Sequence, residues 1–83
     1  MAKVDNITLL DRVEVYHLEA LYSVQRSSAY SRMNKMLDFF NRRSRILYIK
    51  DVAIYDGYET EAKQEEFLKD FKIRLKKYLG KDG

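Results

Sequence analysis

The chain of 83 residues contains no cysteine, no proline and no tryptophan, and it has only three glycines. Without cysteine it can form neither a disulfide nor a thiolate metal site. Because proline and glycine mark turns and loops, their scarcity predicts a mainly helical chain with short connections. Purely apolar runs, such as residues 46–49, extend over only four residues. A membrane span needs about 20 residues, so we expect no membrane partner.

The first residues also lack the apolar segment of a signal peptide, and we therefore expect a cytoplasmic protein. Hydrophobic residues make up 46% of the chain and charged residues 35%, which is typical of a folded domain and not of a disordered one. At this length we expect a single domain of modest stability, because such a chain buries only about 60% of its unfolded surface.

No arrangement of residues typical of an enzyme is present. The sequence has no nucleophile–base pair, no glycine-rich phosphate loop and no metal-ligand spacing. His17 is the single histidine and has no orienting partner at a suitable spacing, which favours a surface or packing role. We therefore expect no catalytic residue, no metal, no cofactor and no small-molecule substrate.

The net charge of +3 is unevenly distributed along the chain. Residues 1–25 carry −2 (two basic, four acidic) and residues 26–50 carry +6 (seven basic, one acidic). Residues 51–71 carry −5 (two basic, seven acidic) and residues 72–83 carry +4 (five basic, one acidic). A charge run alone is compatible with an ordinary solvated face, whereas a basic run beside a DNA-binding motif indicates nucleic acid.

The basic run does follow such a motif, because residues 18–33 have the pattern of a helix-turn-helix. We expect a first helix to end near Tyr22, Ser23 to form the tight turn, and Val24 to enter the core. Ser27 or Ser28 would then cap a second helix. Side chains that bond phosphates or bases crowd this segment: Arg26, Ser27, Ser28, Ser31, Arg32, Asn34 and Lys35. Apolar side chains at helical spacing predict a core-facing stripe: Ala29, Tyr30, Met33, Leu37 and Phe40.

This segment resembles the helix-turn-helix of small bacterial and phage DNA-binding proteins, including excisionase-like factors and repressors. The positions that fit the family pattern are Leu18, Val24, Arg26, Ser27, Ala29 and Tyr30. The departures are Glu19 in place of Ala, Ser23 in place of the turn Gly, Gln25 in place of Ser, and Ser28 in place of Thr. The resemblance implies a sequence-specific binder of double-stranded DNA, acting as a transcriptional regulator or as a recombination or excision accessory factor of a phage or mobile element.

The second helix of such a unit crosses the DNA groove with its first turns facing the bases. We expect Arg32 to make a bidentate guanine contact, and Arg42, Arg43 and Arg45, beyond the helix end, to hold backbone phosphates. The candidate DNA-binding residues are Arg26, Ser27, Ser28, Ser31, Arg32, Lys35, Arg42, Arg43 and Arg45.

The second half of the chain repeats the motif at an offset of 34, which places Val52 on Leu18 and Gly57 on Ser23. Residues 50–56 then form a short helix that ends at the Gly57 turn. A competing interpretation pairs residues 46–49 with residues 52–55 as the hairpin of a winged helix, although Lys50–Asp51 is a poor hairpin turn. Acidic residues begin the last helix and would repel phosphate, so this half is a scaffold or a partner surface.

We expect helices near 8–22 (one helix or two short ones, with Thr8 or Asp11 as a cap), 27–41, 50–56 and 60–79, preceded by a frayed N-terminus. The chain would be a single mainly α helix-turn-helix domain, with residues 8–41 as its DNA-binding half and residues 46–79 as an acidic half. The last helix carries an apolar stripe that either packs on the first helix or forms a homodimer: Phe67, Phe71, Leu75 and Tyr78. The alternative function is a small protein-interaction module on the same scaffold, and an RNA-binding module is less favoured.

Overall fold

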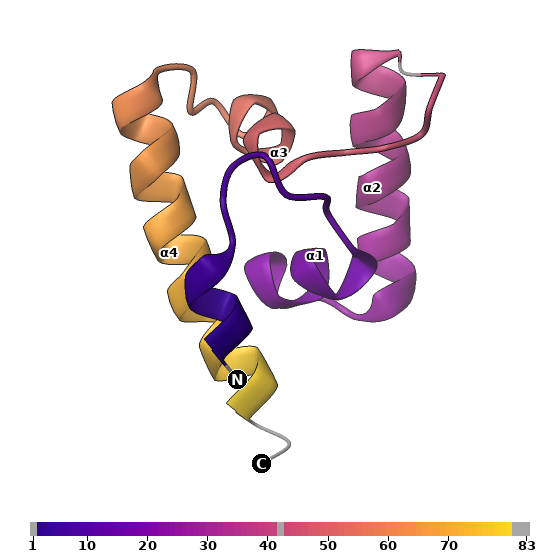
Figure 1. Cartoon of the computed structure of the whole chain (residues 1–83). Helices are drawn as coiled ribbons and strands as arrows, with labels where there is room; N and C mark the ends of the chain where they lie inside the picture. Colours follow the sequence, from indigo (N-terminus) through magenta and orange to yellow (C-terminus); the bar gives the residue numbers. More distant parts are fainter. Residues whose placement is uncertain (1, 42, 81–83) are drawn as a thin grey trace.

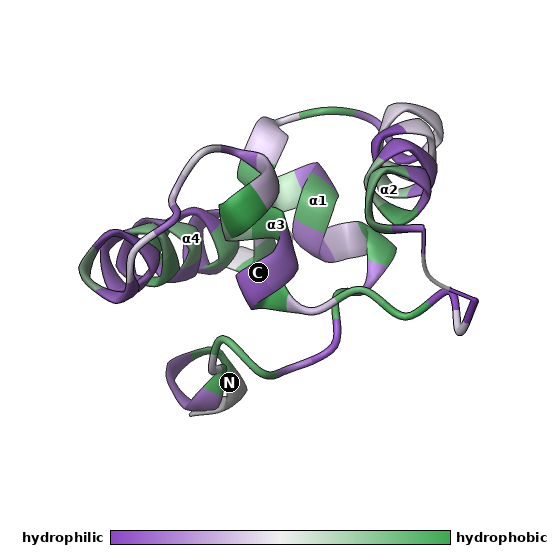
Figure 2. Cartoon of the chain, turned by 90° about the horizontal axis from the view of Figure 1, so that it is seen from above, coloured by the Kyte–Doolittle hydropathy of each residue, from purple (hydrophilic) through white to green (hydrophobic). Residues whose placement is uncertain are grey.

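A computed structural model describes residues 2–41 and 43–80. As expected, the fold is mainly α-helical, and no strand forms within the described residues. A short 3₁₀ helix, η1 (Ala2–Asn6), precedes the helices α1 (Val15–Tyr22), α2 (Arg26–Phe40), α3 (Ile49–Tyr55) and α4 (Glu61–Gly80). The long helices α2 and α4 lie on opposite sides of the molecule, and the short helices α1 and α3 lie between them (Figures 1 and 2).

The last three helices begin and end within one residue of their predicted bounds, whereas the first begins only at Val15 and not at residue 8. Residues 8–11 form a turn instead: the Thr8 amide donates to Asp11 Oδ2 (2.7 Å), and the Asp11 amide donates to the Thr8 carbonyl (3.1 Å). Short polar side chains that bond the nearby backbone compete with helix formation. The two predicted caps therefore close a turn and start no helix.

The N-terminus was expected to fray, and this prediction is wrong for the described residues. Val4 of η1 is buried against the core, and Lys72 Nζ of α4 donates to the Asp5 carbonyl (3.1 Å). Lys76 Nζ lies 2.8 Å from Asp5 Oδ1, and this ammonium group lowers the pKa of the Asp5 carboxyl. One apolar anchor and two lysines thus hold η1 on α4.

The hairpin interpretation of residues 46–55 is also wrong, because Ile49–Tyr55 is helical. The segment before α3 runs beside the segment before α1, with an antiparallel bridge between Arg12 and Tyr48. The Val13 amide donates to the Leu47 carbonyl (2.7 Å), and the Ile49 amide donates to the Asp11 carbonyl (3.0 Å). The segment that contains residues 46–49 therefore joins the two halves of the chain.

The offset of 34 recurs in the way that α1 and α3 begin. Glu14 is the N-cap of α1 and Tyr48 is the N-cap of α3. In α1 the Glu14 amide donates to Nδ1 of His17 (2.9 Å), and in α3 the Tyr48 amide donates to Oδ2 of Asp51 (2.9 Å). In each helix, a side chain three residues after the cap accepts the hydrogen bond of the cap's own amide, as in a capping box.

The offset changes after the turns, because α2 begins at Arg26 and α4 at Glu61, 35 residues later. The second turn (residues 56–60) is two residues longer than the first (residues 23–25), and α3 is one residue shorter than α1. Both turns contain a left-handed residue, Ser23 with φ 54° and Gly57 with φ 97°. The predicted turn at Ser23 is therefore present, and the second half of the chain has an equivalent turn at Gly57.

The core contains most of the predicted apolar residues. On α2, Ala29 and Leu37 are buried, Met33 and Phe40 are half-buried, and Met36 is fully buried although it was not predicted. Tyr30 was assigned to this stripe and is instead 51% exposed, because it lies about 100° around the helix from Ala29.

The stripe of α4 packs within the same chain. Phe67, Phe71 and Leu75 are buried, and Tyr78 is half-buried against the core. This confirms the packing interpretation. Within one chain these side chains are covered, and the exposed apolar residue on the outer face of α4 is Ile73, at 55%.

Candidate nucleic-acid interface

The turn between α1 and α2 sets the direction of α2. Ser23 has φ 54° and ψ 49°, and the amide of Val24 donates to the Glu19 carbonyl (3.3 Å). Val24 is half-buried against the core, as predicted. Only residues 23–25 separate the helices, and α2 therefore runs steeply across α1 at the edge of the molecule (Figure 1).

The start of α2 differs from the prediction by one residue and by its cap. Gln25 is the N-cap, and its side chain makes no capping hydrogen bond. Ser27 and Ser28, the predicted caps, lie inside the first turn with exposed side chains. Their hydroxyl groups therefore face solvent and are accessible to a ligand.

Glu19, the main departure from the family pattern, is 8% exposed and lies where α1 meets α2 and α4. Its Oε2 accepts a hydrogen bond from Arg26 Nε (3.3 Å), and its Oε1 accepts one from the Tyr78 hydroxyl (2.8 Å). The carboxylate is thus accommodated by partners from two other helices. One consequence is that the positive charge of Arg26 is compensated within the chain.

The outward face of α2 is polar. Its exposed side chains along the first three turns are Ser27, Ser28, Tyr30, Ser31, Asn34 and Lys35. In both overall views α2 lies at the periphery, with α1 and α3 on its inner side (Figures 1 and 2). This face offers hydroxyl, amide and ammonium groups on a helix that a groove can accommodate.

The arginines beyond α2 differ in their surroundings. Arg45 folds back on α2: its Nη2 donates to Asn34 Oδ1 (3.1 Å), and its Nη1 lies 3.5 Å from Asp38 Oδ1. Arg43 is exposed and, like Lys35, has no ion pair with any described residue. Arg42 lies outside the described residues. The charge available to a ligand is therefore smaller than the count of basic residues suggests.

Arg32 lies on the flank of α2 that faces α1 and α3. Its guanidinium carbon is 4.4 Å from the centroid of the Tyr22 ring, and the Tyr22 hydroxyl donates to Asp56 Oδ2 (2.6 Å). A hollow of about 360 Å³ opens beside it, lined by Val24, Ser28, Ser31, Arg32, Lys35, Met36 and Tyr55. Of the predicted DNA-binding residues, Ser28, Ser31, Arg32 and Lys35 together line this hollow, whereas Arg26 does not.

No protein-family model, curated protein or solved structure matches this chain. Within the part of the chain that the structure describes, no helix combines the length and the apolar composition needed to cross a bilayer. The function is therefore inferred from the exposed side chains of the described surfaces.

Sequence reasoning missed an exposed aromatic cluster at the end of α2. Phe39 is 66% exposed and packs edge-on against Phe40 (5.0 Å between ring centroids) and against Tyr55 of α3 (5.2 Å). Adjacent residues point about 100° apart on a helix, so Phe39 and Phe40 cannot both face the core. The adjacent Phe39 and Phe40 in the sequence could therefore have indicated an exposed aromatic side chain at this position.

His17 has a packing role, as predicted. It is 5% exposed, its Nδ1 accepts the Glu14 amide hydrogen bond, and its ring lies edge-on to Phe71 (5.5 Å). Burial lowers the pKa of His17, while the carboxylates of Glu14 and Asp11 oppose this shift.

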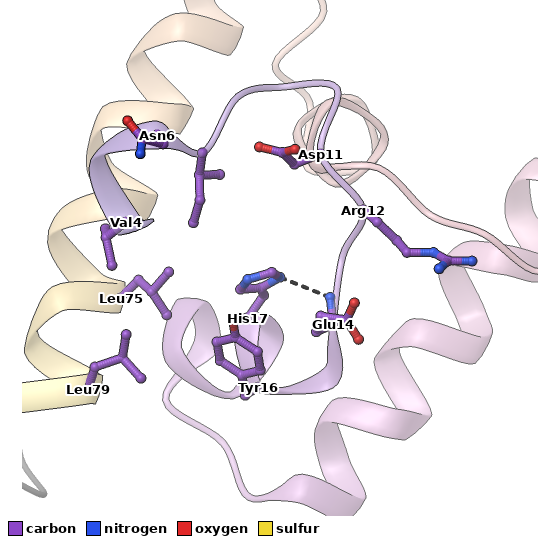
Figure 3. Close-up of a pocket in the computed structure, with 10 residues that line it drawn as sticks. Val4, Asn6, Asp11, Arg12, Glu14, Tyr16, His17, Leu75 and Leu79 are labelled. Carbon is purple, nitrogen blue, oxygen red and sulfur yellow. Dashed lines mark hydrogen bonds between the residues drawn. The ribbon is translucent and has the colours of Figure 1, made fainter. Parts of the chain in front are cut away.

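The imidazole of His17 lines a second hollow, of about 590 Å³, between η1, α1 and α4 (Figure 3). Val4, Leu75 and Leu79 form its apolar wall, and in the close-up the Arg12 side chain points away from it. Among the described residues, no three histidine or carboxylate side chains are grouped to hold a metal ion.

Proposed function

We propose that the chain binds double-stranded DNA through the outward face of α2, as a transcriptional regulator or as a recombination or excision accessory factor. The observation that carries this proposal is the combination of a three-residue turn with an unobstructed, polar second helix at the edge of the molecule. A helix presented in this way can enter the major groove, where hydroxyl and amide side chains bond base edges.

The roles within this interface follow from exposure and pairing. Ser27 lies on the outward face and is our candidate for a base contact, and the amide nitrogen of Asn34, whose Oδ1 accepts a hydrogen bond from Arg45, is a second. Lys35 and Arg43, which make no ion pair among the described residues, would contact backbone phosphates. Because Arg26 and Arg45 are already paired, we expect roughly two to three phosphate contacts and a salt-dependence slope near −2 to −3 on a log–log scale.

Fluorescence anisotropy with a labelled random-sequence duplex, recorded over a series of salt concentrations, tests this proposal. The double variant Lys35→Ala/Arg43→Ala should bind more weakly and show a slope smaller by about two units. A matched control, Lys69→Ala/Lys77→Ala, removes the same charge from exposed positions of α4 and should change binding little. Charge reversal at Glu65 and Glu66 should likewise be tolerated. Absence of salt-sensitive affinity for any duplex near physiological ionic strength would contradict the proposal.

A protein-interaction module is the second candidate, and the exposed aromatic cluster favours it. Phe39, with Phe40 and Tyr55 beside it, gives α2 and α3 a shared apolar surface of the kind that protein partners bury. Phe39→Ser distinguishes the two candidates. Under the DNA proposal it should leave duplex affinity unchanged, because Phe39 lies beyond the first turns of α2.

A further inference from the structure

We propose that the hollow between α2 and the end of α3 is a phosphate subsite in which Arg32 holds a backbone phosphate of the nucleic acid, with Tyr22 and Asp56 as positioning residues for Arg32. This inference rests on the proposed DNA binding and deepens it. It replaces the expected guanine contact of Arg32 with a contact that does not depend on sequence.

The orientation of Arg32 is the first step. Its guanidinium carbon is 4.4 Å from the Tyr22 ring centroid, and Arg32 forms no ion pair among the described residues. This cation–π contact uses none of the guanidinium N–H groups as a hydrogen-bond donor, so these groups are available to bond an oxyanion. The side chain is thus charged, exposed and held in place before any ligand arrives.

The second step is what holds Tyr22. Its hydroxyl donates to Asp56 Oδ2 over 2.6 Å, which joins the last residue of α1 to the C-cap of α3. Burial and the Asp56 hydrogen bond raise the pKa of Tyr22, so the phenol stays protonated and remains a donor. The second half of the chain therefore fixes the ring on which Arg32 lies, although this half carries the acidic face.

The third step is the chemistry of the hollow. Two cations, Arg32 and Lys35, and two hydroxyls, Ser28 and Ser31, line it, with Val24, Met36 and Tyr55 as its apolar part. None of the described residues that line it is acidic. Charged N–H donors together with hydroxyl donors match the oxygens of a phosphate group. Because the hollow lies on the flank of α2, it suits a backbone phosphate beside the groove better than a base edge within it.

The salt dependence of duplex binding tests whether Arg32 contacts a phosphate, because its slope depends on the number of phosphate contacts. Arg32→Ala should lower the slope by about one unit and weaken binding roughly 10-fold, both on random duplex and on a duplex selected for tight binding. Arg32→Lys should retain the slope but lose part of the affinity, because an ammonium group cannot make the bidentate contact. Lys69→Ala, on α4, is the matched control for the loss of one charge and should leave the slope unchanged.

The positioning residues are tested with two variants at one site. Tyr22→Leu removes the ring, and Tyr22→Phe removes only the hydroxyl. We expect a larger loss of affinity for Tyr22→Leu, and we expect the ring-current shift of the Arg32 Nε–H proton to disappear in this variant alone. Circular dichroism melts establish that each variant is folded. An unchanged Arg32 Nε–H shift in folded Tyr22→Leu would overturn the positioning role.

The outcomes separate this inference from the proposed function. If wild-type protein binds no duplex, the DNA proposal fails, and the inference fails with it. If wild-type binding is salt-sensitive but Arg32→Ala weakens only the selected duplex and keeps the slope, Arg32 reads bases and the phosphate subsite is wrong. A third arm titrates inorganic phosphate against chloride at equal ionic strength. Phosphate-specific shifts at Ser28, Arg32 and Lys35 without duplex binding would identify a free-phosphate site and overturn the assignment to nucleic acid.

Discussion

Glu19 shows how one residue can depart from a motif and still support the fold. A buried carboxylate is tolerated only when its oxygens are hydrogen-bonded, and both oxygens of Glu19 have a partner, Arg26 on α2 and Tyr78 on α4. The Arg26 side chain is 67% exposed, so solvent screens most of that ion pair. The half-buried bond to Tyr78 is therefore the one that we expect to stabilise the domain.

Replacing Glu19 tests this assignment. Glu19→Ala removes the hydrogen bond between the Tyr78 hydroxyl and Oε1 of Glu19 and should lower the free energy of unfolding by about 1–3 kcal/mol, measured by urea denaturation. Glu19→Gln keeps an acceptor oxygen and should cost less. Glu66→Ala, at an exposed position, is the control and should stay within about 0.5 kcal/mol of wild type. Equal losses for the alanine and glutamine variants would show that charge, and not the Tyr78 hydrogen bond, is decisive.

His17 makes the stability of the domain dependent on pH. Burial lowers its pKa below the ordinary value of 6.5, with Glu14 and Asp11 opposing. The unfolded chain therefore takes up a proton at a higher pH than the folded chain does. The stabilisation is present above about pH 6.5 and is lost as the pH falls toward the folded pKa. Protonation would also remove the acceptor at Nδ1 that bonds the Glu14 amide.

We expect the urea midpoint of the wild-type chain to be lower at pH 5 than at pH 7.5. His17 is the only histidine, so no other side chain with an ordinary pKa titrates through this range. Asp5, whose pKa is lowered by Lys76, acts only at more acidic pH, below about 3.8. His17→Gln retains an acceptor for the cap and should remove most of the pH difference. If the difference in urea midpoint between pH 5 and pH 7.5 persisted in His17→Gln, it would have to arise from groups other than His17.

The elements show which parts of the fold the sequence alone could predict. The turns at Ser23 and Gly57 and the helices that flank them follow from local backbone preferences, and they lie close to where they were expected. The start of α1 differs from its predicted position, because Thr8 and Asp11 form their own turn and the Glu14 amide donates a hydrogen bond to His17 at the beginning of the helix. The spacing of apolar residues does not reveal such hydrogen bonds, although a single side chain that bonds the backbone can determine where a helix begins.

The two turns provide a matched pair of substitutions. Ser23 adopts φ 54°, a left-handed conformation that disfavours residues with a Cβ atom, whereas Gly57 adopts φ 97° at the equivalent position. Ser23→Gly should raise the free energy of unfolding by about 0.5–1 kcal/mol, and Gly57→Ala should lower it by about 1–2 kcal/mol. A Cβ atom at Gly57 would meet nothing within 4 Å, so its cost comes from the backbone alone. Urea denaturation of both variants is the measurement. Destabilisation by Ser23→Gly would contradict this account.

At the scale of the whole molecule, the helical fold was predictable from composition and spacing, but the surroundings of the candidate site residues were not. Tyr30 is exposed, Arg32 lies over Tyr22, and Arg45 returns to Asn34 and Asp38. Each of these positions depends on packing between segments that are distant in sequence. The period of an α-helix predicts which residues share a face of the helix. It does not predict which segment of the chain packs against that face or which charged side chains form ion pairs.

The arrangement of the helices also decides how the chain can associate. The inner face of α4 packs on α1, α3 and η1, and its outer face lies away from them with Ile73 exposed. While the stripe stays within the chain, the outer side of α4 is the face of this helix that a second copy could contact.

Two neighbouring substitutions on α4 test this arrangement. Phe71 is 1% exposed, and Phe71→Glu would bury an unpaired charge at a cost of at least about 3 kcal/mol, a large part of the stability of so small a domain. We expect this variant to be unfolded by circular dichroism at room temperature. Ile73→Glu, two residues away on the 55% exposed side, should remain folded with a melting temperature close to wild type. Sedimentation velocity on wild type and Ile73→Glu then shows whether the outer face of α4 associates. A folded, monomeric Phe71→Glu variant of a dimeric wild-type protein would instead mean that the stripe is an interface between copies and that its burial within one chain is wrong.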